Sequence, residues 1–294
     1  MGKRTRGQQI FAVFNALLMV LIIITCLLPL INVLAVSFSK QEAVAAGEVS
    51  LLPVGFTTVA YTTILKDRLF LRTFGNSLLR LLAGVPINLF LAITAAYPLS
   101  KNGNKLAFRQ GYVWFFVTTM LVGGGLIPTY LTIRALGLLG SFWALILPGA
   151  VSAYNMILLL NFFKTIPSEL EEAALIDGAG HWRILWGLYV PCSLPAIATL
   201  TLFFVVGHWN EWFSAQIYLN RTEQYPLQSY LQVLLTQSKN TQNLSLKELE
   251  ELAKVNNRTF NSAQIVLSTL PVLLVYPFLQ RYFVTGLTLG SVKG

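Results

Sequence analysis

Hydrophobic positions in this chain gather into six long apolar segments with polar stretches between them. Each segment is close to or above the length of about 20 residues that an α-helix needs to cross a bilayer. The pattern therefore predicts an all-α integral membrane protein with six transmembrane helices. The predicted spans cover residues 10–36, 78–99, 111–133, 141–163, 188–215 and 263–279.

Prolines interrupt several of these segments. Proline removes a backbone donor and kinks a helix, and lipid tolerates the freed carbonyl only where a neighbouring helix or a cavity satisfies it. We therefore expect kinks, or broken helices of the kind that surround a central site in transporters. The prolines concerned are Pro29, Pro86, Pro191, Pro195, Pro271 and Pro277.

Positive charge indicates which ends of the spans face the cytoplasm, because cytoplasmic loops carry an excess of Lys and Arg. With the N-terminus inside, the internal pieces hold ten such residues in 59 positions and the external pieces ten in 95. This density favours an N-in, C-in topology, with a transmembrane domain over residues 10–285 between cytoplasmic tails at 1–9 and 286–294. Arg80, near the start of the second predicted span, is expected to snorkel to the interface.

Composition and missing motifs exclude most other classes. The chain is 55% hydrophobic and 11% charged, with a mean hydropathy of +0.63, which excludes a soluble globule and a disordered chain. The chain has a net charge of +9, but its Lys and Arg residues are spread between the apolar segments instead of forming one basic face, so no nucleic-acid partner is predicted. No G-x-x-x-x-G-K-[ST], H-E-x-x-H or G-x-S-x-G motif is present. We expect no catalytic residue, no metal site and no bound cofactor, and Cys26 and Cys192 are expected to be packing residues.

The internal loop over residues 164–187 has a distinctive pattern. Ser168 and Glu171 have the S-x-x-E spacing of a capping box at a helix N-terminus. Gly178 can take a positive φ and end that helix. Glu169, Glu172 and Asp177 offer carboxylates to a basic partner, and Ala173 and Ala174 form a flat surface that another backbone could approach. The loop thus predicts a short cytoplasmic helix.

Part of this loop resembles a known signature. Glu172, Ala173 and Ala174 are followed after three residues by Gly178, and nine residues later by the sequence LYVP, which ends at Pro191. This is similar to the EAA signature of ABC-importer membrane permeases, usually written E-A-A-x3-G-x9-I-x-L-P. Leu and Val stand here where Ile and Leu are usual, and both changes keep the volume and polarity of the side chains.

The resemblance extends over nearly the whole chain. Motifs similar to those of the carbohydrate-importer branch, the maltose-permease relatives, are AAYPLSK (95–101), LIPTYL (126–131), LGL (136–138), WALILP (143–148), IDGA (176–179) and WN (209–210). Residues 225–228 (YPLQ) and the ending over 280–294 are similar to the subgroup associated with oligosaccharides or polysaccharide fragments.

The resemblance implies a fold, a set of partners and a location. The fold would be the type I ABC importer permease fold, with a cytoplasmic coupling helix, in the bacterial cytoplasmic (inner) membrane. The partners would be a second permease subunit, two ABC ATPases that use ATP and Mg, an external solute-binding protein, membrane lipid and an oligosaccharide substrate. In such permeases the coupling helix docks in a groove on the ATPase.

The resemblance also assigns roles to residues of the loop. Glu172 would form an ion pair with the ATPase, Ala173 and Ala174 would contact its groove, and Gly178 would make the turn into a second short helix. The remaining residues of the expected coupling site are Leu170 and Leu175, as packing residues, Asp177 and Pro191.

Polar residues within the predicted spans are candidates for a substrate path, because they are costly in lipid and usually face a cavity or a neighbour. Trp209, Asn210, Glu211 and Trp212 combine aromatic faces with hydrogen-bonding groups, as sugar sites do. An aromatic belt at the outer interface is the alternative. Midway along the fourth span, Tyr154 and Asn155 could contact substrate or form an interhelical hydrogen bond.

The external loop over residues 216–262 contains a charged stretch at 247–254 that predicts a short helix. It could dock the solute-binding protein or be a solvated loop. The function predicted is that of a permease subunit in an ATP-driven, binding-protein-dependent importer of oligosaccharides. The alternatives are import of another solute, such as a polyamine or an amino acid, and a membrane-embedded enzyme or scaffold.

Overall fold

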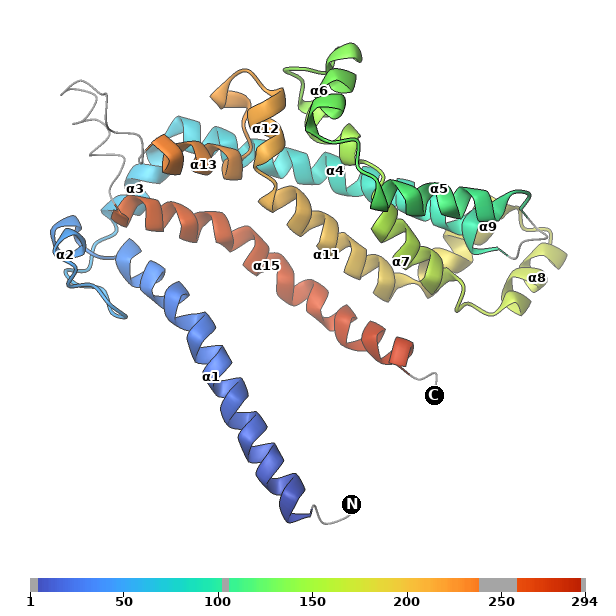
Figure 1. Ribbon diagram of the computed structural model, residues 1–294, viewed down its shortest axis with the longest axis horizontal. Coiled ribbons are helices and arrows are strands. Elements are labelled where there is room, and N and C mark those ends of the chain that lie inside the picture. Colours follow the sequence, from blue (N-terminus) through green and yellow to red (C-terminus); the bar gives the residue numbers. More distant parts are fainter. Residues whose placement is uncertain (1–4, 102–105, 238–257, 292–294) are drawn as a thin grey trace. The chain divides into compact units, whose positions relative to one another are not determined.

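A computed structural model of the protein describes residues 5–101, 106–237 and 258–291 (Figure 1). Within these ranges the chain forms helices joined by turns and loops, and no β-strand occurs in them. The expected all-α class is thus confirmed for this part of the chain. The predicted helix at 247–254 lies outside the described residues. Two compact units are present, residues 1–68 with 233–270 and residues 69–232 with 271–294.

The first unit begins with a long apolar helix, α1, which contains the first predicted span and the proline at position 29. The chain after α1 folds back through a short helix pair. Phe38 stacks on Tyr61 with ring centroids 4.7 Å apart, and the Tyr61 hydroxyl lies 2.7 Å from Ser37 Oγ. These contacts fix the loop against the end of α1. The bounds are α1 (Arg6–Ser37), α2 (Gln41–Ala45) and α3 (Val59–Lys66).

The second unit begins with α4 (Arg68–Ser100), which starts ten residues before the predicted span. This earlier start corrects the interpretation of Arg80. The residue lies inside the helix and is only 3% exposed, so it does not snorkel to an interface. Its charge is neutralised within the protein, as described below.

Three of the predicted spans are broken instead of continuous. The third is divided into α5 and α6, which are bent by 115°, and the fourth into a 3-10 segment and α7, bent by 47°. Three consecutive glycines end at Gly125, whose φ of +78° lets the chain turn between α5 and α6. Pro148 and Gly149 lie in the 3-10 segment before α7. The bounds are α5 (Arg109–Leu121), α6 (Leu126–Ala135), η1 (Phe142–Leu145), η2 (Leu147–Gly149) and α7 (Ala153–Phe163).

The fifth predicted span begins earlier than expected and bends by 84°. A π-helical turn, η3, interrupts it just before Pro191, and the main helix resumes at Leu194. The prolines inside α1, α4 and α15 leave those helices continuous. Of the prolines considered above, Pro191 and Pro195 are the two that lie next to a bend. The bounds are α9 (His181–Ile184), η3 (Leu185–Tyr189), α10 (Val190–Cys192) and α11 (Leu194–Asn210).

Beyond α11 the chain forms short helices and then a long one. The long helix α15 contains the sixth predicted span. Among the described residues, α1, α4 and the three bent pairs are long and apolar enough to cross a membrane. The six-helix, N-in, C-in arrangement stays a prediction. The bounds are α12 (Phe213–Tyr218), η4 (Thr222–Gln224), α13 (Leu227–Gln237) and α15 (Arg258–Ser291).

The main core of the second unit lies where α4, α7, α9, η3 and α11 meet (Figure 1). Side chains from all five elements exclude solvent there, which holds the end of α4 against the bent segment around η3. This is the region from which the loop after α7 projects. Its most buried members include Ala96, Met156, Leu159, Phe163, Ile184 and Leu200.

A glycine permits one close approach in this bundle. A Cβ added to Gly84 of α4 would lie 2.6 Å from His208 Nε2 of α11. That nitrogen is also 2.6 Å from Asn88 Oδ1, while the Asn88 amide donates to the carbonyls of Gly149 and Ala150 at 3.1 and 2.8 Å. The ring therefore has little freedom to move away.

We expect Gly84→Ala to destabilise the protein by about 1–3 kcal/mol, the usual effect of overpacking. Gly75 lies on the same helix with no atom within 4 Å of a Cβ at its position. Gly75→Ala should be neutral or stabilising by about 0.5–1 kcal/mol, because alanine favours a helix interior. Thermal unfolding in detergent measures both. Equal effects of the two substitutions would show that the His208 contact is not restrictive.

Candidate functional site

The loop after α7 forms the expected short helix, α8 (Ser168–Ile176). Its end is as predicted. Gly178 has a φ of +76°, its amide donates to the Leu175 carbonyl at 3.0 Å, and the Ala179 amide donates to the Ala174 carbonyl at 2.9 Å. This pair of bonds is a Schellman motif, which requires the left-handed residue that glycine supplies. Figure 1 shows α8 at the same end of the second unit as α9.

The start of α8 differs from the prediction. Ser168 is the first helical residue and Pro167 occupies the cap position, where no side-chain cap bond is formed. The predicted capping box is therefore wrong. Glu171 does not return to the Ser168 amide because its carboxylate is turned into the protein, toward a lysine from another helix.

One face of α8 is directed outward. Glu172 and Ala173 are exposed, and Ile176, which follows them at helical spacing, is 86% exposed. We call Glu172, Ala173 and Ile176 the coupling face. Asp177 and Gly178, just beyond it, are exposed too, and so is Trp182 of α9, at 60%. An exposed isoleucine and tryptophan beside a carboxylate are typical of a surface that binds another protein.

Ala174, Leu170 and Leu175 have different surroundings from the coupling face. Ala174 is half-buried and packs on the protein's own core, so it does not form a flat outer surface together with Ala173. Leu170 and Leu175, expected to be packing residues, are 46% and 40% exposed. The inward direction of α8 is occupied by Glu171 and Ala174, which leaves the two leucines at its flanks.

The inward side of α8 carries a buried ion pair. The Lys101 ammonium donates to Glu171 Oε2 at 2.7 Å, and the two side chains are 9% and 4% exposed. The hydroxyl of Tyr189 donates to the same oxygen at 2.9 Å. The Lys101 nitrogen also lies 3.8 Å from the ring centroid of Tyr97 and 3.9 Å from that of Tyr189. A cation between two aromatic faces is favoured electrostatically, most strongly where water is excluded.

Three elements, α4, α8 and η3, position these groups. Tyr97 lies in the last turns of α4 and Lys101 follows its end, while Glu171 belongs to α8. Tyr189 ends the π-helical turn η3, and Pro191, which is exposed, follows in α10. The Tyr97 hydroxyl lies 3.3 Å from Nδ1 of His181 in α9, which ties the start of the same bent segment to α4. π-Helical turns are frequent at functional sites.

Cavities border the ion pair on two sides. One of about 370 Å³ is lined by Tyr97, Lys101, Glu171 and Trp182, among others. A second of about 730 Å³ includes Lys101 and Glu171 together with Arg109 and residues at the start of α8. Room for displacement therefore exists beside this contact.

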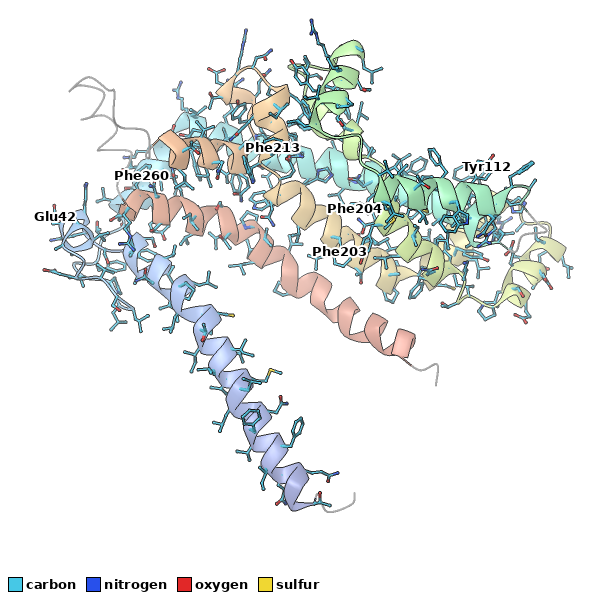
Figure 2. The ribbon with its side chains drawn as sticks, viewed as in Figure 1. Glu42, Tyr112, Phe203, Phe204, Phe213 and Phe260 are labelled. Atoms are coloured by element: carbon cyan, nitrogen blue, oxygen red, sulfur yellow. The ribbon has the colours of Figure 1, made fainter. Side chains whose placement is uncertain are left out.

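A second polar region lies inside the bundle. A cavity of about 440 Å³ is lined by residues of α4, α7, α11 and α12 and of the 3-10 segment before α7. Two predicted path residues, Asn155 and Glu211, meet at it. Phe203 and Phe204, labelled on α11 in Figure 2, form an apolar part of its wall. The other polar lining residues are Arg80, Asn88, Ser152, His208, Ser214 and Tyr218.

Arg80 and Glu211 form the charged part of this cavity. The guanidinium donates to Glu211 Oε2 at 2.8 Å, and also to the backbone carbonyls of Glu211 and Leu145, each at 3.1 Å. The Glu211 carboxylate is bonded in addition to the hydroxyl and the amide of Ser214. The pair connects α4 to the segment between α11 and α12.

The other predicted path residues lie elsewhere. Trp209 is 2% exposed and packs edge-on against Phe74, with ring centroids 5.9 Å apart, so it does not face the cavity. Asn210 and Trp212 are exposed. Tyr154 is 56% exposed at the start of α7, close to the break in the fourth span. The path assignment stays a prediction.

Several site residues were missed by reasoning from the sequence. The sequence assigns neither Lys101 nor His208 to a site, and it predicts that Arg80 snorkels to the interface. Their partners are 70, 120 and 131 residues away in the sequence, so no local spacing could reveal them. The single available signal was the presence of a charged or polar residue in or beside an apolar segment.

The two regions combine an exposed face of a short loop helix with a polar cavity in a bundle of broken apolar helices. A family model described as the binding-protein-dependent transport system inner membrane component matches residues 89–288. The chain belongs to this family. It is therefore a multi-pass permease subunit of the inner membrane, as expected, and ATP is used by a partner ATPase. The alternative of a membrane-embedded enzyme or scaffold is wrong.

Relatives of the permease match it from end to end. The polygalacturonan/rhamnogalacturonan transport system permease protein YtcP of Bacillus subtilis (strain 168) is 41% identical over 282 residues, covering 96% of this chain and 97% of the relative. Protein LplC of the same organism is 38% identical over 300 residues, covering 99% and 97%.

A solved structure confirms the permease fold. It is the crystal structure of a bacterial ABC transporter involved in the import of the acidic polysaccharide alginate. One of its chains is 34% identical to the permease, with a TM-score of 0.86 over 96% of this chain and 100% of that one. The predicted ABC permease fold is therefore confirmed.

Proposed function

We propose that the permease forms half of the membrane path of an ATP-driven importer of oligosaccharide fragments. Its partners would be a second permease subunit, two ATPases and an external solute-binding protein. The observation that carries the proposal is the coupling face of α8, where Glu172, Ala173 and Ile176 are directed away from the permease's own core. With the predicted N-in, C-in topology, this face is cytoplasmic and available to an ATPase.

The geometry assigns a role to each part of the coupling face. Glu172 is free to pair with a cation of the ATPase, Ala173 permits close approach of its backbone, and Ile176 can enter an apolar pocket. Gly178 ends the helix, so that α9 leads back into the bundle. Movement of an ATPase that holds this face would be passed through α8 to the bent segment formed by α9, η3 and α10.

The substrate proposal rests on the relatives and on the cavity in the bundle. Two of the proteins described above carry names that refer to polygalacturonan/rhamnogalacturonan and to the acidic polysaccharide alginate. The cavity of about 440 Å³ offers hydrogen-bonding groups from Asn155, His208 and Glu211 beside the rings of Phe203 and Phe204. Such a mixture suits a sugar, and we expect fragments of acidic polysaccharides to be the cargo. Docking of the binding protein on the 216–262 loop remains part of this proposal.

Co-purification tests the proposed function. Expressed with its partner subunits, the tagged permease should retain an ATPase. Glu172→Lys should reduce that retention at least about tenfold, because it places a cation against the cation that Glu172 is proposed to bind, and like charges across an interface cost several kcal/mol. Uptake of oligosaccharide into proteoliposomes should fall with it.

The matched control is Glu42→Lys on α2, an exposed glutamate outside the loop that changes the net charge equally (Figure 2). It should leave capture of the ATPase and uptake unchanged. Full retention of the ATPase by the Glu172→Lys permease would refute the assignment of the coupling face.

A further inference from the structure

The two consecutive glutamates of α8 have different surroundings. Glu172 is exposed on the coupling face, whereas Glu171 is 3% exposed and bonded to Lys101 and Tyr189. We propose that Glu171 is a positioning residue whose ion pair with Lys101 transmits displacement of α8 to α4 and η3. This inference rests on the proposed function, because it names the connection through which the docked helix acts.

The contacts converge on one carboxylate oxygen. Glu171 Oε2 accepts from the Lys101 ammonium at 2.7 Å and from the Tyr189 hydroxyl at 2.9 Å. Lys101 in turn lies between the rings of Tyr97 and Tyr189, at 3.8 and 3.9 Å from their centroids. The end of α4, the helix α8 and the turn η3 are thus joined at a single point, which we call the Lys101–Glu171 joint.

Electrostatics makes this joint stiffer than an apolar contact. Separating a buried carboxylate from a buried ammonium breaks their ion pair in a medium of low dielectric constant, which is costly. The aromatic rings add a directional preference, because a cation is attracted to ring faces and not to ring edges. When α8 moves, Lys101 and Tyr189 therefore have to follow it.

The rest of α8 is weakly held. The helix has nine residues, which is too short for independent stability in water, and its exposed flanks carry Leu170 and Leu175. Ala174 of the helix packs against the core of the second unit. Cavities of about 370 and 730 Å³ border the joint, so a displacement need not compress packed side chains. The joint can therefore move as a unit with the helix.

The experiment compares neutralisation of each glutamate in the complete importer, reconstituted in proteoliposomes with its ATPase, partner permease and binding protein. Glu171→Gln should retain the ATPase in full but lower the number of substrate molecules imported per ATP hydrolysed by about five- to tenfold, within the usual range of coupling between sites. Glu172→Gln should instead reduce retention of the ATPase. Normal import per ATP in the Glu171→Gln complex would overturn the inference.

A double variant separates coupling from folding. Lys101→Met or Glu171→Gln alone breaks the buried ion pair and should lower the yield of folded permease, whereas the Lys101→Met, Glu171→Gln pair should recover that yield. If the joint transmits motion, import per ATP stays low in the double variant. Recovery of import together with yield would show that the pair serves stability alone and would overturn the inference.

Tyr189→Phe supplies a milder test that keeps the ring against Lys101. It removes one donor to Glu171 and should reduce import per ATP by about two- to fivefold without loss of the ATPase, as expected for one lost hydrogen bond to a charged group. No change would contradict the joint. The proposed function fails in a different way, through absence of ATPase capture and uptake in the unmodified complex, so the two failures are distinguishable.

Discussion

Replacement of Glu211 by alanine should lower the free energy of unfolding by about 3–5 kcal/mol, the typical cost of leaving a buried charge without its partner. The Arg80 side chain is 4% exposed and donates to three oxygens, two of them backbone carbonyls and one from the Glu211 carboxylate. In the variant only the two carbonyls remain as acceptors. The amide and hydroxyl of Ser214 would lose their acceptor too. Thermal unfolding of the purified permease in detergent measures the loss.

An exposed ion pair in the same unit provides a matched control for the buried one. Arg72 of α4 and Glu223 of η4 form an ion pair at 3.0 Å with both side chains more than half exposed. Glu223→Ala should therefore cost less than about 1 kcal/mol, because exposed ion pairs contribute little. The double variant Arg80→Met, Glu211→Ala should recover part of the loss, since no charge then remains buried alone. Similar losses for Glu211→Ala and Glu223→Ala would contradict this account of burial.

Introduction of lysine at Ile176 should abolish most of the ATPase binding. If docking buries this side chain, its transfer from water contributes about 1.5–3 kcal/mol, which is about ten- to hundredfold in the dissociation constant. A lysine would lose that contribution and add a charge to be desolvated. The position lies in the last turn of α8, where a cation is favourable to the helix dipole, so unfolding of the helix would not explain the result.

Binding of detergent-purified permease complex to its separately purified ATPase measures the effect. Thr165→Lys, at an exposed position of the same loop but outside α8, adds the same charge and should leave the dissociation constant within about twofold, as expected for a charge away from the contact. An unchanged affinity for the Ile176→Lys variant would mean that the coupling face is not the ATPase contact.

The Glu211→Ala and Ile176→Lys variants both change residues whose role the sequence indicated poorly. The EAA motif drew attention to Glu172 and Gly178, and its spacing predicted a helix that ends at the glycine, which the Schellman bonds confirm. The same motif gave no reason to examine Ile176, and the separate S-x-x-E spacing of Ser168 and Glu171 wrongly predicted a capping box. A local pattern was correct about where the helix lies and wrong about which way Glu171 points.

The broken spans likewise show what the sequence predicts and what it does not. Hydropathy located the apolar segments, because a helix that crosses lipid needs a minimum number of apolar residues whatever its neighbours are. It could not locate the bend of 115° after Leu121 or the π-helical turn before Pro191. Those breaks depend on partners for the freed backbone groups, and the partners come from other helices.

The sequence by itself determined the class of the molecule, its family and the position of the short loop helix α8, because apolar length, glycine placement and motif spacing are local properties of the chain. Only the tertiary structure decided which charges are paired. Lys101 meets Glu171, and Arg80 meets Glu211, across 70 and 131 residues respectively. A buried charge is stabilised by whatever the fold brings within about 3 Å of it, and that neighbour is set by helix packing, not by sequence spacing.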